Sequence, residues 1–237
     1  MIDTVLFDLD GTLLPMDQDL FIKTYFSELT KKMMAHDCEP KKLIEWVWAG
    51  TEAMIRNNGE LTNREAFYNL FAEASGLDAE IYEPLFDRFY QEEFDSVQRI
   101  LGSSFGQPEI IAKLRNKNYR VVLATAPVFP RLAVKTRLNW IGLDERDFDH
   151  ITTYENCHYC KPNIDYYREI FDTIGADPQN SLMIGNNARD DMVVEGLGTA
   201  TFLLTDYLEK TNSEEAGLYR SGDAAALIAF LDELPVL

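Results

Sequence analysis

Short apolar runs alternate with helical patterns along most of this chain, and that alternation narrows the possible folds more than any other feature. The runs that predict buried strands are Thr4 to Leu9, Arg120 to Thr125, Ser181 to Ile184 and Thr201 to Leu204. A weaker candidate is His150 to Tyr154, and helical patterns cover Pro108 to Lys117 and Ile164 to Ile174. Strands that alternate with helices predict an α/β fold with a doubly wound parallel sheet.

The segment between the first two strands has a different pattern. Apolar residues recur there at helical spacing, as in Ile22, Phe26, Leu29 and Met33, and again in Phe67, Leu70, Phe71 and Ala74. Thr62 and Glu65 form a capping box at the start of a helix. No strand pattern is evident in this segment. We therefore predict an α/β core of residues 1–15 and 103–237 with an all-helical domain, 16–102, inserted into it.

The inserted segment is rich in aromatic side chains, among them Phe21, Trp46, Trp48, Phe67 and Phe71. Large aromatic residues at helical spacing are more often part of a protein core than of a ligand site. We expect these side chains to form the core of the helical domain.

The composition limits the partners of the protein. Of its 237 residues, 40 are acidic and 22 are Lys or Arg, which gives a net charge of -18. Such a field repels nucleic acid and anionic membranes, so we expect neither as a partner. It also repels a phosphate substrate at long range, and affinity for one requires a local metal ion or lysine.

Nothing in the sequence indicates a secreted or membrane-spanning chain. The N-terminus lacks a signal-peptide pattern, and no apolar run approaches the roughly eighteen residues that a spanning helix needs. The three cysteines do not indicate a disulfide framework. Cys157 and Cys160 have the spacing of a zinc-binding pair, but zinc needs four ligands and no second pair is present. We expect a cytoplasmic protein.

The first strand delivers two carboxylates to its carboxyl end. Asp8 and Asp10 are two residues apart, so their side chains point to the same side of the chain. Gly11 follows and permits a sharp turn. Two like charges this close repel each other, and they persist where a cation or a reaction uses both. This combination indicates a catalytic site.

The run from Val5 to Leu14 resembles the first motif of the haloacid dehalogenase-like superfamily, whose members are mostly magnesium-dependent phosphatases. A helical insertion directly after this motif is similar to the mobile cap of that superfamily. The resemblance implies a Rossmann-like core and a nucleophile at Asp8, which forms an aspartyl-phosphate. It also implies a general acid and base at Asp10 and a magnesium ion held in part by Asp8 and by the backbone carbonyl of Asp10.

Two further segments resemble the second and third motifs of this superfamily. Thr125 ends an apolar strand, where its hydroxyl can donate a hydrogen bond to a phosphate oxygen. Lys161 precedes Pro162 and an amphipathic helix, where its charge can neutralise the nucleophile and the transferred phosphoryl group. We predict that Thr125 and Lys161 bind the phosphoryl group.

The fourth motif departs from the superfamily pattern. The loop Gly185 to Asp191 follows an apolar strand, but Asn186 stands where the superfamily has Asp. Asn offers a carbonyl oxygen to a metal ion but no charge. The resemblance places metal ligands at Asn186 and at Asp191 or its neighbour Asp190, and the spacing does not choose between the two acids.

These residues together predict a magnesium-dependent phosphatase that acts on a small phosphorylated metabolite. A phosphomutase would keep all of the motifs. A haloacid dehalogenase would share the nucleophile and the lysine, but Asp10 supplies the acid that phosphate esters need. A protein that binds phosphate or metal with weakened catalysis is a further alternative, because Asn186 removes one anionic ligand.

Overall fold

A single parallel sheet forms the centre of the larger domain in the computed structural model, which describes residues 1–34, 39–76, 79–209 and 216–237. The sheet has six strands in the order β3-β2-β1-β4-β5-β6, and every neighbouring pair is parallel. The strands are β1 (Thr4–Phe7), β2 (Arg120–Leu123), β3 (His150–Ile151), β4 (Ser181–Gly185), β5 (Ala200–Leu204) and β6 (Ser221–Gly222). The predicted fold class is confirmed.

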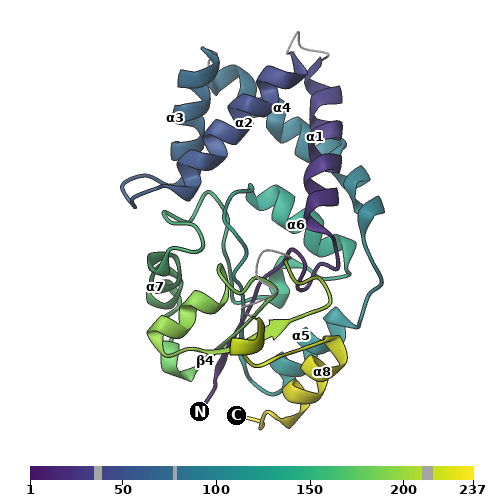
Figure 1. Cartoon of the computed structure of the whole chain (residues 1–237), viewed down its shortest axis with the longest axis vertical. Coiled ribbons are helices and arrows are strands. Elements are labelled where there is room, and N and C mark those ends of the chain that lie inside the picture. Colours follow the sequence, from purple (N-terminus) through teal and green to yellow (C-terminus); the bar gives the residue numbers. More distant parts are fainter. Residues whose placement is uncertain (35–38, 77–78, 210–215) are drawn as a thin grey trace.

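Alternate residues of the central strand face different layers of helices. Val5 and Phe7 belong to one buried cluster and Leu6, between them, to another, as the two-residue period of a strand requires. The first cluster contains side chains of α5 (Gln107–Asn116), α6 (Arg131–Trp140) and α8 (Ala224–Glu233). The second contains side chains of α7 (Ile164–Ile174), which lies at the opposite edge of the core in Figure 1. The sheet is therefore covered on both faces.

The expected elements are present, with small differences at their ends. The helix α7 has the predicted bounds, and α5 begins and ends one residue earlier than expected. The strand β3 stops at Ile151 rather than Tyr154 because the chain turns there, and the Thr153 amide donates to Oδ1 of Asn156 (2.8 Å). The strand β6 was not expected, since two small residues carry no hydrophobic signal.

Within its described residues, the inserted segment contains helices joined by short turns and no strand. It contains α1 (Gln18–Met34), α2 (Pro40–Ile55), α3 (Asn63–Ser75), α4 (Ala79–Glu92) and a 3-10 helix, η1 (Phe94–Ile100). The capping box at Thr62 and Glu65 is confirmed, and Gly76 ends α3 in the left-handed conformation. These helices stand above the carboxyl edge of the sheet in Figure 1.

Two connecting segments join the helical layer to the core, and they are bonded to each other. The amide of Gly102 donates to the carbonyl oxygen of Pro15 (2.7 Å). This contact supports the proposed domain division at residues 15 and 103.

A second attachment lies at the start of α3. Asn63 is fully buried, and its amide donates to the carbonyl oxygen of Cys157 (2.8 Å). The next amide, of Arg64, donates to the carbonyl oxygen of Tyr154 (2.8 Å). Because the first amides of a helix have no partner inside the helix, these core carbonyls complete the hydrogen bonding of α3.

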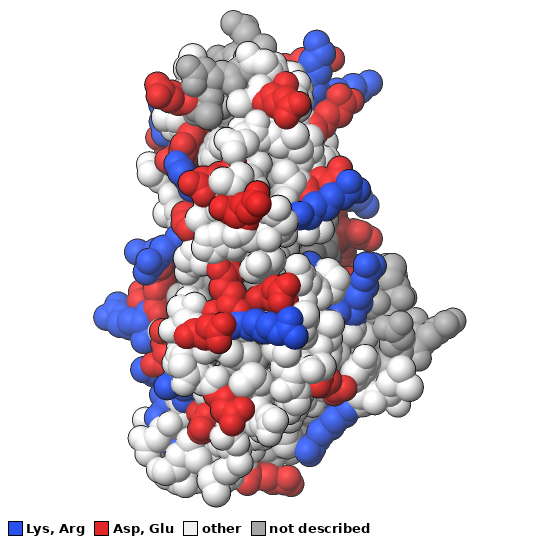
Figure 2. Space-filling view, turned by 90° about the vertical axis from the view of Figure 1, so that its left-hand side faces the viewer, with Lys and Arg blue, Asp and Glu red and all other residues white. Residues whose placement is uncertain are grey.

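The surface carries mixed charge. On the face shown in Figure 2, acidic and basic side chains are interspersed over the cap and the core, and the described residues form no broad basic area. Among the described helices, none combines the length and the apolar character needed to cross a bilayer.

Candidate active site

The site lies where the carboxyl ends of β1, β2 and β4 meet. Asp8 directly follows β1, and its amide donates to the carbonyl oxygen of Ile184 in β4 (2.9 Å), which continues the pairing of these strands. Gly11 turns the chain with a φ of 82°, and a Cβ at this position would collide with the side chain of Asn186. The glycine is needed for both its conformation and its close approach to the fourth motif.

Lys161 joins two of the predicted carboxylates. Its Nζ lies 2.8 Å from Oδ1 of Asp8 and 2.6 Å from Oδ1 of Asp191, and the lysine side chain is 2% exposed. Burial disfavours the charged lysine, but the carboxylates of Asp191 and Asp8 outweigh it and hold the pKa of Lys161 well above its ordinary value. The lysine is therefore a fixed positive charge beside Asp8.

Asp191 is held on both of its oxygens. Besides the contact with Lys161, Oδ2 accepts a hydrogen bond from the amide of Asn187 (3.0 Å). Burial raises the pKa of Asp191 above its ordinary value, against the opposing effect of Lys161. The neighbouring Asp190 faces the cavity above the site, and burial raises its pKa as well. The metal roles predicted for these two residues stay predictions.

Asn186 lies against the first motif. Its Oδ1 accepts a hydrogen bond from the hydroxyl of Thr12 (3.2 Å), and its Nδ2 donates to the carbonyl oxygen of Tyr207 (2.8 Å). The amide carbonyl is thus positioned beside the turn that carries Asp8 and Asp10.

Thr125 supplies a buried hydroxyl without a protein partner. Its side chain is 1% exposed, and Oγ1 has no hydrogen bond to any described residue. Its backbone oxygen accepts hydrogen bonds from the hydroxyls of Thr152 (2.7 Å) and Tyr166 (2.8 Å), which fixes this end of the sheet. A buried polar atom without a partner costs free energy, and a phosphate oxygen at this place would satisfy it.

Arg137 is part of the site and was not among the residues that the sequence indicated. Its side chain is fully buried, and Nη1 lies 2.7 and 2.5 Å from the two carboxylate oxygens of Asp10. The guanidinium carbon is 4.5 Å from the centre of the Phe129 ring. A signal for it exists in the sequence, because Arg137 lies at helical spacing with Ala133 and Val134, on the buried face of α6.

The arginine and the burial of Asp10 have opposite effects on that carboxyl group. Burial raises the pKa of Asp10, and Arg137 lowers it by less, so the pKa remains above its ordinary value. A raised pKa brings a carboxyl group closer to the range in which it donates and accepts protons.

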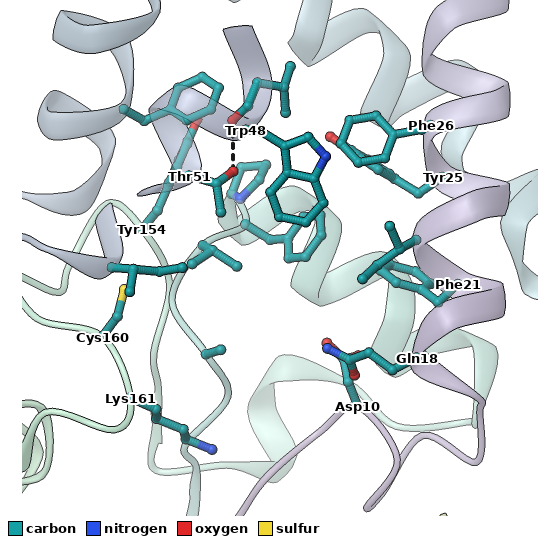
Figure 3. Close-up of a pocket in the computed structure, with 18 of the residues that line it drawn as sticks. Asp10, Gln18, Phe21, Tyr25, Phe26, Trp48, Thr51, Tyr154, Cys160 and Lys161 are labelled. Carbon is teal, nitrogen blue, oxygen red and sulfur yellow. Dashed lines mark hydrogen bonds between the residues drawn. The ribbon is translucent and has the colours of Figure 1, made fainter. Parts of the chain in front are cut away.

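A cavity of about 240 Å³ opens above these residues, between the core and the cap. Figure 3 shows Asp10 and Lys161 on its floor, with Phe26, Trp48 and Thr51 at the opposite end. Three of the aromatic residues expected in the cap core, Phe21, Trp48 and Phe67, line this cavity. The other two, Trp46 and Phe71, pack against each other as expected, with ring centres 6.2 Å apart.

The charges and donor atoms of the site fit a divalent cation. The carboxylates are Asp8, Asp10, Asp190 and Asp191, and the cations facing them are Lys161 and Arg137, which leaves two negative charges in excess. Within the described ranges, no three His, Cys, Asp or Glu side chains converge on one metal position. A magnesium site here therefore needs oxygen atoms of other kinds, such as the amide carbonyl of Asn186 and the backbone carbonyl of Asp10.

The Cys157–Cys160 segment packs at the junction between the core and the cap. Both thiols are free and buried, and Sγ of Cys160 accepts a hydrogen bond from Nδ2 of Asn63 (3.3 Å) at the junction with the cap. His158 lies 2.5 Å from Oε1 of Glu169. Cys38 lies outside the described residues.

The sequence pattern of the haloacid dehalogenase-like hydrolases matches residues 5–203, and the chain belongs to this family. It is an enzyme of the hydrolase class, as expected. It is 26% identical over 200 residues to the pyrophosphatase PpaX of Bacillus cereus (strain AH820), an alignment that covers 84% of this chain and 82% of that one.

Solved structures share the whole fold. A HAD phosphatase from Thermococcus onnurineus matches with a TM-score of 0.62 and 18% identity, over 99% of this chain and 100% of the other. The putative HAD-hydrolase YfnB from Bacillus subtilis, solved bound to magnesium, matches with a TM-score of 0.58 and 18% identity, over 98% and 99% of the two chains. At 18% identity, these two matches show a shared fold and nothing beyond it.

Proposed function

We propose that this protein is a magnesium-dependent phosphatase that hydrolyses a small phosphomonoester through an aspartyl-phosphate on Asp8. The observation that carries the proposal is the position of Lys161, whose Nζ lies 2.8 Å from Asp8 and 2.6 Å from Asp191. A buried cation at this place orients the nucleophile and offsets the charge of the incoming phosphoryl group. The family membership and the phosphatase relatives support the reaction class.

In the first step, a carboxylate oxygen of Asp8 attacks phosphorus and the bond to the leaving oxygen breaks. Asp10 gives its proton to that leaving oxygen, a role that suits its raised pKa. Lys161 and the unpartnered hydroxyl of Thr125 hold the phosphoryl oxygens.

In the second step, Asp10 takes a proton from a water molecule, which attacks phosphorus and releases phosphate from Asp8. A bound magnesium ion would neutralise charge on the phosphoryl oxygens. Asp8, the backbone carbonyl of Asp10, Asn186 and one of Asp190 and Asp191 are the ligands that we propose for it.

The test is phosphate release from a panel of small phosphate esters, with magnesium and with EDTA. Asp8→Asn is the matched control, because the substitution keeps the size of the side chain and removes the nucleophile. We expect metal-dependent release that the variant abolishes. Equal release by the variant would rule out the covalent mechanism, and no release from any ester would favour a mutase or a binding protein.

A further inference from the structure

The cavity above Asp10 and Lys161 has an unusual lining for a phosphate site. Its cap side is built mainly from aromatic rings, including Phe21, Tyr25, Phe26, Trp48, Phe67 and Phe86. From this lining we infer that the substrate is a phosphomonoester of an apolar, ring-sized group, an aryl or short alkyl phosphate, and not a sugar phosphate or pyrophosphate. The inference rests on the proposed phosphatase function and specifies its substrate.

Apart from Gln18, which lies beside Asp10 in Figure 3, and the carboxylates, several polar groups of the cavity lining already have partners within the protein. The hydroxyls of Tyr25 and Tyr90 are 2.9 Å apart and bonded. The hydroxyl of Thr51 donates to the carbonyl oxygen of Val47 (2.8 Å), the bond that is drawn as a dashed line in Figure 3. A sugar, which needs several donors and acceptors, would leave its own hydroxyl groups without partners here.

The cavity also lacks a cation for a second phosphate. Among the described residues that line it, Lys161 is the one basic side chain, and its Nζ is held by Asp8 and Asp191. The nearby Arg137 is paired with Asp10 through Nη1, and its Nη2 has no partner among the described residues, but the side chain is fully buried and is not part of the cavity lining. The second phosphate of pyrophosphate would therefore lie among the aromatic rings of the cavity, where no basic side chain offsets its negative charge.

The volume of the cavity is large enough for the ring of an aryl phosphate. A cavity of about 150 Å³ lined by apolar side chains is large enough to bind benzene. The cavity in this protein is about 240 Å³, and the phosphoryl group would sit on its floor between Asp10 and Lys161. The remaining space fits one ring or a short alkyl chain.

Trp48 is the residue on which to test this inference. It belongs to α2, lines the cavity, and is 46% exposed, so its loss leaves the buried core intact. Trp46, two residues earlier in the same helix, is outside the cavity lining and packs on Phe71. Trp46→Ala is therefore a matched control for Trp48→Ala.

The experiment measures kcat/KM for benzyl phosphate, glycerol phosphate and pyrophosphate with the wild-type enzyme and both variants. We expect the wild type to prefer benzyl phosphate by on the order of a hundredfold, since a matched apolar group in such a pocket gives discrimination of this size. Trp48→Ala should reduce that preference about tenfold or more, and Trp46→Ala should leave it unchanged. Equal or better turnover of glycerol phosphate or pyrophosphate would overturn the inference and leave the phosphatase function standing.

A binding measurement separates the two proposals if no ester is hydrolysed. Calorimetry compares benzylphosphonate with methylphosphonate, in the presence of magnesium, on the wild type and on Trp48→Ala. Tighter binding of benzylphosphonate, with a negative heat-capacity change that the Trp48→Ala variant reduces, would uphold the apolar ligand although the phosphatase function had failed. Equal affinities for the two phosphonates would overturn the inference.

Discussion

Replacing Arg137 by methionine removes the buried partner of Asp10 while keeping a side chain of similar length. Removing one member of a buried ion pair costs about 3–5 kcal/mol, because the remaining charge is left without compensation. The Arg137 side chain is 0% exposed but that of Asp10 is 16% exposed, so water reaches the remaining carboxylate and the cost falls toward the lower end of the range.

For a chain of this length, each kcal/mol lowers the melting temperature by about 2–4 °C. A loss of about 3 kcal/mol therefore corresponds to a fall of roughly 6–12 °C. Thermal unfolding followed by calorimetry or circular dichroism measures it. The matched control is Arg168→Met, since Arg168 pairs with Asp165 at 2.7 Å but is 56% exposed. We expect that control to cost less than about 1 kcal/mol.

The double variant Asp10→Asn/Arg137→Met completes the test. Neither charge is then left alone, so its melting temperature should lie above that of Arg137→Met. Equal melting temperatures for Arg137→Met and Arg168→Met would refute the reasoning. The reasoning would also be refuted if the double variant lost as much stability as Asp10→Asn and Arg137→Met lose in sum when each is made alone.

Three other predictions concern the phosphate and metal positions. Thr125→Val removes a buried hydroxyl without a protein partner, so the melting temperature should stay the same or rise. The value of kcat/KM should fall about tenfold or more, and an unchanged kcat/KM would contradict the phosphate role. Asn186→Asp should tighten magnesium binding measured by titration, and equal or weaker affinity would count against the assignment. The same substitution should lower the melting temperature of the metal-free enzyme, because a carboxylate oxygen would face the Tyr207 carbonyl. Burial raises the pKa of Asp191. At a pH above the ordinary Asp pKa, the folded state therefore binds more protons than the unfolded state. The metal-free enzyme should then lose stability as the pH rises from about 4 to about 7. Magnesium added at about pH 7 should restore it, and a flat profile would contradict that account.

The sheet could be predicted because its strands are buried on both faces. β1, β2, β4 and β5 are continuous apolar runs, and they were found to within two residues at each end. The two-residue strand β6 could not be found, since its pairing with β5 depends on the folded backbone and not on its side chains. Helix boundaries with a chemical signal, such as the capping box at Thr62, were found at their positions.

The meeting of the candidate site residues could be predicted where they stand in recognisable motifs. Asp8 and Lys161 are 153 residues apart in the sequence and meet in the structure. Arg137 was missed because an arginine in an amphipathic helix is ordinarily solvated, and here its helical position turns it toward Asp10. The cap aromatics were assigned to a core because helical spacing indicates a buried face but not whether that face closes on protein or on a cavity.

The attachment of α3 to the core would make any opening of the helical domain observable in hydrogen exchange. The amides of Asn63 and Arg64 are the first two of that helix, and the carbonyl oxygens that hold them, of Cys157 and Tyr154, belong to the core. Because no carbonyl within α3 can replace those partners, the two amides are protected only while α3 stays docked on the core. We therefore expect their exchange rates to report any separation of the helical domain from the core.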